Sequence, residues 1–183
     1  MTPRCSVFIA TSLDGYIARS NGSVDWLDAL NKTVPEGEDC GYARFMASVD
    51  ALVMGRHTFE TVLSFREWPY GEKPVLIASR SLKSLPAHLP AQVELTSQAP
   101  ASLVTQARAR GWHRLYVDGG ELVRSFLRAG LITDLTITTV PVLLGSGRRL
   151  FGELEEDLSV RLLSSVAYPF GFVQSVYEVN RPA

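Results

Sequence analysis

In the first two thirds of the chain, short apolar runs alternate with segments in which apolar residues recur every three or four positions. A continuous apolar run is typical of a strand that is buried on both faces of a sheet, whereas a spacing of three and four is typical of an amphipathic helix. The predicted strands of this part are 4–10, 51–54, 74–78, 92–95 and 114–117. The predicted helices are 25–30, 38–49, 58–63, 102–110 and 121–129.

Beyond residue 130 the pattern changes to long segments that are rich in β-branched residues and partly alternate between apolar and polar positions. The segments 134–144, 159–168 and 172–180 are therefore predicted to be antiparallel strands. Residues 11–24 contain Asp-Gly and Asn-Gly pairs and predict a long loop with turns. Early strands that alternate with helices, followed by a block of strands, indicate one α/β domain over 1–183 with a mixed sheet rather than a pure Rossmann fold.

Composition and charge narrow the class of protein. The 183 residues are 46% apolar and carry a net charge of -1, which suits one domain with a real core and argues against nucleic acid or an anionic membrane as the main partner. No apolar stretch approaches the roughly 20 residues of a membrane span, and residues 1–12 lack the pattern of a signal peptide. Cys5 and Cys40 lack CxxC spacing, which favours a reducing cytoplasm, and the scattered histidines predict no metal site.

Two glycine-bearing turns carry the main functional signal. In 52–60 and again in 115–123, an apolar run ends in glycine and passes directly into a helix-like run. A helix N-terminus presents unpaired N–H groups and a partial positive charge, and glycine lets the backbone approach a phosphate closely. Arg56 adds a fixed cation, and Thr58 either caps the helix or binds a phosphate oxygen. Each turn alone also fits an ordinary connection, but the pair predicts a ligand with a phosphate bridge, such as a dinucleotide.

Further charged residues extend this interpretation. Ser79 and Arg80 follow a buried strand, where the arginine either holds a ribose 2′-phosphate and selects NADPH or is a solvated surface residue. Arg148 and Arg149 lie in a loop between two long strands and are candidates to face an anionic substrate. Asp39 begins a predicted helix, so it either caps that helix or serves as a pocket carboxylate whose pKa is raised by burial.

Several motifs resemble known reductases. Residues 54–60 (MGRHTFE) resemble the strand–helix turn of dihydrofolate reductases. Residues 12–18 (SLDGYIA), 117–120 (VDGG) and 141–151 (PVLLGSGRRLF) resemble still more closely the reductase (C-terminal) domain of the bacterial riboflavin-biosynthesis deaminase-reductase and its stand-alone relatives. The resemblance spans nearly the whole chain. It implies a dihydrofolate-reductase-like three-layer α/β/α fold with a central mixed sheet of about eight strands, and NADPH bound across the carboxyl ends of the strands.

The same resemblance implies the residues of the site. Cofactor contacts are expected at Ala10, Ile17, Gly55, Arg56, His57, Thr58, Ser79, Arg80, Gly119, Gly120, Glu121 and Leu122. Of these, 55–58 and 119–122 belong at the phosphates and the nicotinamide side and 79–80 at the 2′-phosphate, and the peptide between the two glycines of 119–120 is often cis in the family. Substrate contacts are expected at Trp26, Tyr42, Thr138 and Arg148, and the expected catalytic acids are Asp14 and Asp39.

The resemblance therefore predicts an NADPH-dependent reductase with a small-molecule substrate. The first candidate substrate is the ribosylaminopyrimidine of riboflavin synthesis, as in a 5-amino-6-(5-phosphoribosylamino)uracil reductase. A second is dihydrofolate, with Asp39 binding the pterin, and a third interpretation is a nucleotide-binding module without turnover. The zinc motif of the deaminase half is absent, which excludes deamination by this chain. Relatives are commonly dimers, and the late strands offer a surface for a homodimer.

Overall fold

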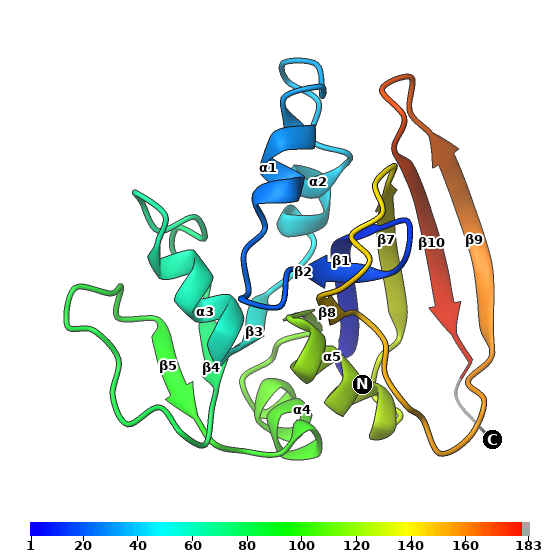
Figure 1. The fold of residues 1–183 in the computed structure, drawn as a ribbon. Helices are drawn as coiled ribbons and strands as arrows, with labels where there is room; N and C mark the ends of the chain where they lie inside the picture. Colours follow the sequence, from blue (N-terminus) through cyan, green and yellow to red (C-terminus); the bar gives the residue numbers. More distant parts are fainter. Residues whose placement is uncertain (181–183) are drawn as a thin grey trace.

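A computed structural model of the chain describes residues 1–180 and shows a single large sheet with helices on both faces (Figure 1). The strands are β1 (Arg4–Ser12), β2 (Tyr16–Ala18), β3 (Ala51–Gly55), β4 (Val75–Ala78), β5 (Val93–Thr96), β6 (Arg114–Asp118), β7 (Asp134–Val140), β8 (Arg148–Arg149), β9 (Val160–Ala167) and β10 (Val173–Val179). The helices are α1 (Asp25–Asn31), α2 (Tyr42–Ala47), α3 (Arg56–Leu63), α4 (Pro100–Ala109) and α5 (Gly120–Arg128).

The main sheet has eight strands in the order β5-β4-β3-β6-β1-β7-β10-β9. All neighbours from β5 to β7 are parallel, and β10 runs antiparallel to both β7 and β9. The expected mixed sheet of about eight strands is thereby confirmed. Because the first six strands in this order are parallel, their carboxyl ends share one edge of the sheet, which is where ligands bind in open α/β folds.

Helices cover both faces of the sheet, as the continuous apolar runs require. In β3, Ala51 and Val53 pack in the cluster that contains α4 and α5, whereas Leu52 and Met54 pack in the cluster that contains α2 and α3. Successive side chains of a strand point to opposite faces, so a strand that is covered on both sides must be apolar throughout. The three-layer α/β/α arrangement follows from this pattern.

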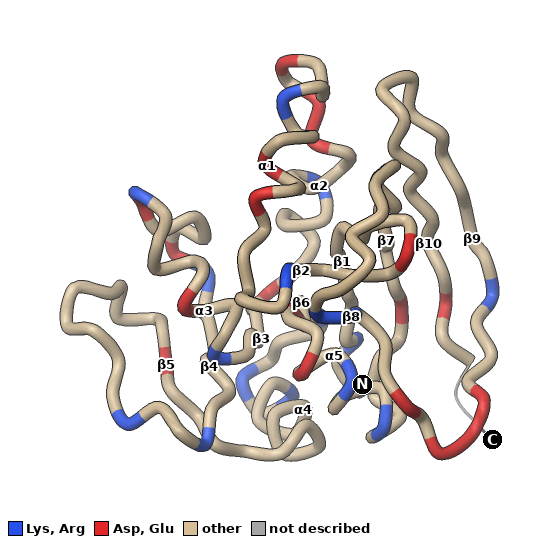
Figure 2. The backbone as a smooth tube through the Cα atoms, in the orientation of Figure 1, with Lys and Arg blue, Asp and Glu red and all other residues tan. Residues whose placement is uncertain are grey.

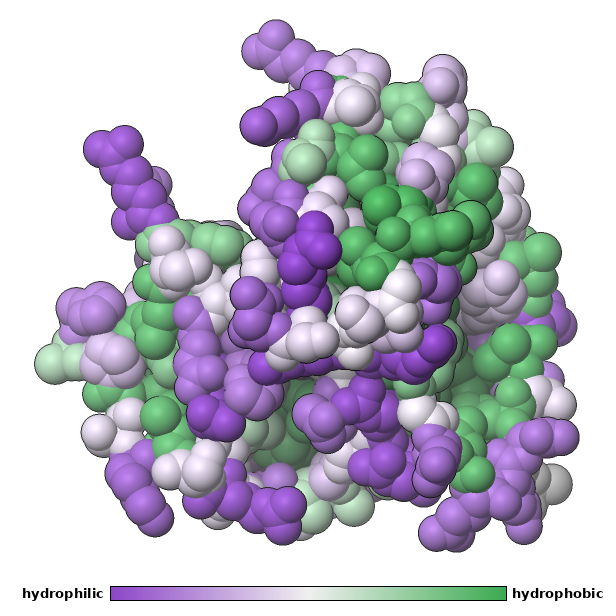
Figure 3. Space-filling view, in the orientation of Figure 1, coloured by the Kyte–Doolittle hydropathy of each residue, from purple (hydrophilic) through white to green (hydrophobic). Residues whose placement is uncertain are grey.

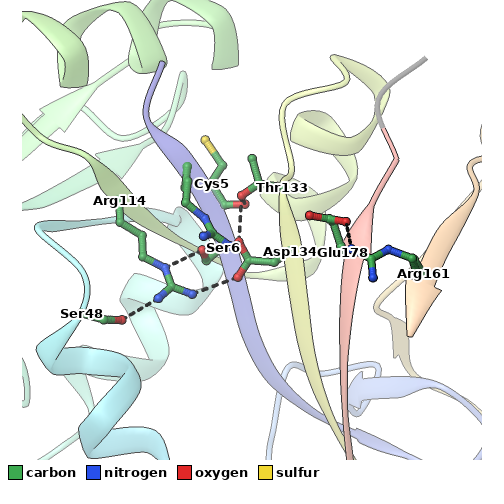
Figure 4. A network of polar contacts seen from close by, with 9 residues as sticks. Cys5, Ser6, Ser48, Arg114, Thr133, Asp134, Arg161 and Glu178 are labelled. Carbon is green, nitrogen blue, oxygen red and sulfur yellow. Dashed lines mark hydrogen bonds and ion pairs between the residues drawn. The ribbon is translucent and has the colours of Figure 1, made fainter. Parts of the chain in front are cut away.

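A buried polar network ties three strands together at their amino ends (Figure 4). The Asp134 carboxylate is almost fully buried and accepts hydrogen bonds from Ser6 Oγ at 2.9 Å and Thr133 Oγ1 at 2.8 Å. Arg114 and Arg4 donate to the same carboxylate at 2.9 and 3.1 Å. The network joins β1, β6 and β7 at the end of the sheet opposite to the carboxyl ends of these parallel strands.

The structure differs from the sequence prediction at four elements, β2, β8, α2 and β7. The segments 11–24 and 145–150, predicted as loops, contribute the short strands β2 and β8, which pair with one another. Helix α2 is shorter than the predicted 38–49, since Gly41 before it adopts a left-handed φ of 82° that ends the turn of 38–41. Strand β7 ends at Val140 rather than at residue 144, because Pro141 has no N–H to donate to the ladder.

Strand β9 forms the outer edge of the sheet and is exposed along its whole length. Figure 3 shows apolar side chains on the molecular surface over this strand. The half-exposed residues of the strand include Val160, Leu162, Leu163 and Val166. Within the described residues, no helix has the length and apolar character needed to cross a membrane.

Candidate functional site

A cleft of about 800 Å³ opens at the carboxyl ends of β1, β3 and β6. Its walls come from the start of α3, the start of α5, the 17–27 segment and the β8 region. Among the expected cofactor residues, those that line it are Ala10, Ile17, Gly55, Arg56, His57, Thr58, Gly119, Gly120, Glu121 and Leu122. The fold thus gathers in one place two glycine turns that lie more than sixty residues apart in the chain.

The two turns touch because their strands are neighbours. Strands β3 and β6 pair in parallel with Met54 opposite Asp118, so Gly55 and Gly119 follow at the same level. Gly119 has a φ of 96°, and a Cβ at this position would overlap Thr58 Oγ1 and lie 3.9 Å from the Gly55 nitrogen. The N-termini of α3 and α5 therefore converge, and only glycine permits both the backbone angle and the close approach.

The expected cis peptide between the two glycines is not present, since no peptide bond within residues 1–180 is cis. Gly119 instead turns the chain with φ 96° and ψ 134°, a combination that is open to glycine. The next glycine, Gly120, is also tightly enclosed: a Cβ there would lie 2.8 Å from Ile17 Cδ1 and 3.1 Å from the Arg149 carbonyl oxygen.

Basic side chains surround the cleft. Figure 2 shows Lys and Arg positions beside β2, β8 and the start of α3. Arg56 and His57 open α3, and both contact Glu60 one turn later, at 2.9 and 3.2 Å. Arg124 pairs with Glu121 on α5. The wall is therefore cationic but partly neutralised by acids of the same helices, which suits a ligand of moderate negative charge.

The paired strands β2 and β8, called the β2–β8 ribbon, form one wall of the cleft. Arg149 stacks on the Tyr16 ring at 4.6 Å and donates to the Tyr16 hydroxyl at 3.1 Å. Arg148 lines the cleft, and its guanidinium lies against Gly22, where a Cβ would approach it to 3.4 Å. Both arginines expected to face a substrate thus line the cleft, and Arg149 in addition holds the ribbon through Tyr16.

Comparison with known proteins agrees with this geometry. Residues 3–173 match the sequence profile of the RibD C-terminal domain. The chain belongs to the RibD C-terminal domain family. It is 34% identical to the uncharacterized protein YwjB of Bacillus subtilis (strain 168), over 88% of this chain and 90% of that protein.

Solved structures extend the family match to the whole fold. The crystal structure of a putative riboflavin biosynthesis protein from Shewanella sp. PV-4 is 40% identical, with a TM-score of 0.90 over 99% of this chain and 100% of the other. The Thermotoga maritima diaminohydroxyphosphoribosylaminopyrimidine deaminase/5-amino-6-(5-phosphoribosylamino)uracil reductase is 15% identical, with a TM-score of 0.70, and shares the fold. The match covers 98% of this chain but only 57% of the T. maritima chain.

Two expected contacts lie near the cleft but outside its lining. Ser79 and Arg80 follow β4, which is the neighbour of β3, so they stand at the same edge of the sheet. The Ser79 hydroxyl accepts a hydrogen bond from the backbone N–H of Leu82 at 3.0 Å and shapes the turn after the strand. Arg80 is exposed. The family's assignment of both residues to a 2′-phosphate stays a prediction.

The expectation that burial raises the pKa of Asp39 is wrong. Asp39 is exposed and accepts hydrogen bonds from the backbone N–H groups of Ala43 at 2.7 Å and Gly41 at 2.8 Å. These N–H groups, Ala43 first, lower the pKa of Asp39. The alternative reading of Asp39 as a helix-capping residue is the one that the structure supports. The residue does not line the cleft.

Asp14, the other expected catalytic acid, is also used by the fold itself. It accepts hydrogen bonds from Ser12 Oγ at 2.6 Å and from the backbone N–H groups of Gly145 and Leu144 at 2.7 and 3.1 Å. The Ser12 hydrogen bond is the largest of the effects that lower the pKa of Asp14 to about 2. A carboxylate that is ionised throughout the neutral range and bound to its own chain is an anchor for the 141–147 loop rather than a proton donor.

Three of the four expected substrate contacts do not reach the cleft. Trp26 is buried with Val140 and Phe172, because adjacent residues of α1 face different directions and it is Leu27 that lines the cleft. Thr138 is buried in β7, where its hydroxyl accepts a hydrogen bond from the Gln174 amide at 3.0 Å. These two residues are therefore structural.

Tyr42 lies at the border of the site. Its ring packs edge-on against Phe8, and burial, with a smaller effect of the Asp118 charge, raises the pKa of Tyr42 to about 12. It stays neutral and packs on Phe8 without lining the cleft.

Sequence reasoning missed Asp118 and the apolar wall beside it. Asp118 lines the cleft together with Val62, Phe65 and Tyr70. Burial raises the pKa of Asp118 to about 6. Asp118 belongs to the VDGG motif at 117–120, but the two glycines of that motif indicate only a backbone contact with a ligand. The available signal was an acid at the end of an otherwise apolar strand, directly before the ligand turn.

Proposed function

We propose that the chain is an NADPH-dependent reductase that transfers a hydride to a C=N or C=O bond of a heterocyclic or ribosylaminopyrimidine substrate. The single observation that carries this proposal is the contact between the two helix N-termini, where Gly119 packs on Thr58 beside Gly55. Two converging sets of backbone N–H groups suit a diphosphate better than a single phosphate. Membership of the RibD C-terminal domain family supports the same assignment.

The residues present fit a reduced pyridine nucleotide. The N–H groups that open α3 and α5 would hold the diphosphate, and the side chains of Arg56 and Thr58 would add a cation and a hydroxyl. Ala10 and Ile17 supply an apolar surface for a flat ring in the same cleft. Arg80, at the end of β4, is assigned to the 2′-phosphate that distinguishes NADPH from NADH. Such a cofactor supplies the hydride, and the protein supplies position and electrostatics.

The substrate half of the cleft is apolar with one acid. Leu27, Phe65 and Tyr70 offer flat contact for a heterocycle, and Arg148 stands where an anionic substituent would meet it. This combination fits the phosphorylated ribosylaminopyrimidine that the name of the T. maritima relative contains. The dihydrofolate alternative depended on Asp39 in the pocket, and that residue is exposed and engaged with α2.

Fluorescence titration with NADPH tests the proposal directly. We expect the purified protein to bind NADPH more tightly than NADH, and Arg80→Ala to reduce that preference. Gly119→Ala should weaken NADPH binding by at least tenfold, because the added Cβ collides with the Thr58 hydroxyl. This contact lies where the N-termini of α3 and α5 meet, a region that we call the phosphate cradle. Oxidation of NADPH at 340 nm is then followed with 5-amino-6-(5-phosphoribosylamino)uracil and with dihydrofolate as separate substrates.

Gly130→Ala is the matched control for the glycine variant. Gly130 also has a positive φ, 64°, but no atom lies within 4 Å of the position of its added Cβ. It therefore bears the backbone strain without the collision, and its NADPH affinity should stay at the wild-type value. If the wild-type protein binds neither NADPH nor NADH, the reductase assignment is refuted.

A further inference from the structure

The side-chain carboxyl of Asp118 lies at the cleft. Asp118 is the last residue of β6 and lies directly before Gly119. Side chains along a strand alternate between faces, and Tyr116 packs in the cluster that contains Phe45 of α2 and Val62 of α3. Asp118, two positions later, points to that same face. Its carboxyl is therefore placed beside the apolar wall of the cleft, next to the Gly119 N–H.

The groups that face Asp118 are phenols rather than cations. Tyr42 of α2, Tyr70 from the segment after α3 and Tyr116 of β6 are the titratable groups whose ionisation is coupled to its charge. In the described part of the chain, no ion pair within 4.0 Å includes Asp118. The Tyr116 hydroxyl donates to the Phe8 carbonyl at 2.8 Å, and the Tyr116 side chain also contacts the Asp118 carboxyl.

The surroundings decide the protonation of this carboxyl. Burial is the main cause that raises the pKa of Asp118 to about 6, and the Gly119 N–H and the Tyr116 side chain only partly oppose it. Asp14, in contrast, is ionised through the same range because three donors stabilise its charge. Among the two acids expected from the sequence and this third one, Asp118 alone lines the cleft and has a raised pKa, so that it is partly protonated near pH 6.

We propose that Asp118 is the proton donor of the reductase site and that it hydrogen-bonds, in its protonated form, to the oxygen or nitrogen of the substrate bond that is reduced. This inference rests on the proposed function. The carbon of the C=O or C=N bond accepts a hydride from the reduced pyridine nucleotide, and the π electrons of that bond move to the heteroatom. The Asp118 carboxyl gives its proton to the heteroatom, becomes a carboxylate and regains a proton from solvent, while the nucleotide leaves oxidised.

Two variants test the role of the carboxyl. Asp118→Asn keeps the shape of the side chain and a hydrogen-bond donor but cannot release a proton, so turnover should fall by roughly 10²-fold or more. Asp118→Glu restores a titratable carboxyl and should recover part of the rate. For the wild type, kcat should fall as the pH rises through about 6, and that pH dependence should vanish in the Asn variant.

Two readouts that do not depend on turnover accompany the kinetics. The ¹³C resonance of the Asp118 carboxyl, followed from pH 3 to pH 9 in the protein without cofactor, reports its titration directly, and fluorescence titration gives NADPH affinity. Asp28→Asn is the matched control, since Asp28 is an exposed acid of α1 outside the cleft lining. It should change neither the kcat nor its pH dependence.

The outcomes separate this proposal from the proposed function. A carboxyl that titrates near pH 4, or an Asn variant that turns over at the wild-type rate with an unchanged pH profile, overturns the role of Asp118 while leaving the reductase in place. Asn-variant protein that binds NADPH like the wild type but turns over slowly supports the role. Failure of the wild type to bind NADPH overturns the proposed function, and the role of Asp118 in it falls as well.

Discussion

At the scale of single residues, the acids of this chain show how position decides chemistry. Asp14, Asp39 and Asp118 have the same side chain, but the Ser12 hydroxyl lowers the pKa of Asp14 and backbone N–H groups lower the pKa of Asp39. Asp118 meets a wall of phenols and apolar groups, and burial raises its pKa to about 6. A carboxylate that is desolvated without a cation is costly for the folded state, so Asp118 is expected to lower the stability of the protein when it is ionised.

This cost predicts how stability depends on pH. Below about pH 4, Asp118 is protonated in both the folded and unfolded states, whereas between about pH 4 and 6 only the folded state keeps the proton. The contribution of Asp118 to folding therefore becomes less favourable as the pH rises, and levels off above its folded pKa. Asp118→Asn should gain roughly 1–3 kcal/mol in the free energy of unfolding at pH 8 relative to pH 4, compared with wild type.

Urea denaturation at the two pH values measures this difference, because effects of the other titrating groups cancel between variant and wild type. Asp28→Asn again serves as the control and should give no pH-dependent gain. A gain for Asp118→Asn that is equal at pH 4 and pH 8 would show that the carboxyl is not perturbed in the folded protein.

At the scale of elements, the parts that were predictable are those whose signal is local. The buried strands β3, β4 and β6 follow from continuous apolar runs, and the phosphate cradle follows from glycines placed between a strand and a helix. Strands β2 and β8 have three and two residues and pair across more than a hundred positions, so no periodicity reveals them. Their pairing appears only when the whole chain is folded.

The site residues divide in the same way. Gly119 was predictable because the strand–glycine–helix order indicates an unusual backbone, and Gly55 stands in the same order on the neighbouring strand. The raised pKa of Asp118 depends on its burial, and the side chains that enclose it come from separate elements that the sequence alone does not bring together. Asp39 and Trp26 were assigned by resemblance to positions of a related pocket, and the local hydrogen bonds and core packing of this chain use them differently.

The amino-end network predicts a large stability effect at an element junction. Asp134 accepts hydrogen bonds from arginines of β1 and β6, so Asp134→Asn leaves Arg114 and Arg4 without this anion. We expect a loss of about 3 kcal/mol in the free energy of unfolding by urea denaturation. NADPH affinity of the folded variant should be unchanged, because the network lies at the opposite end of the strands from the cleft.

Glu178→Gln is the matched control for this junction. It removes the acid of the Arg161–Glu178 pair, which joins β9 to β10 at 2.6 Å, but both side chains are about half exposed. Exposed pairs contribute little, so the loss should stay below about 1 kcal/mol. Equal losses in the two variants would mean that the Asp134 network stabilises the fold no more than an exposed ion pair does.

At the scale of the whole molecule, the two edge strands of the sheet differ in length and exposure. The β5 edge is short, with four residues, whereas β9 presents eight residues that are all exposed. An edge strand of this length normally carries charges or proline that prevent pairing, but β9 has no proline and a single charged residue, Arg161. Leu162 and Val166 are 53% and 48% exposed along it. Such an edge is suited to pair with a second copy of itself about a two-fold axis.

We therefore expect the protein to be a homodimer through β9, which light scattering after size exclusion measures as twice the chain mass of 20.1 kDa. The double variant Leu162→Lys/Val166→Lys places two charges on the strand in each copy and should give the monomer mass, with the NADPH affinity retained because β9 is remote from the cleft. Leu143→Lys makes the same change at a leucine that is 69% exposed outside the sheet, and should stay dimeric. A dimer that survives the double variant would assign the interface to another surface, and a monomeric wild type would show that β9 is tolerated as a bare edge.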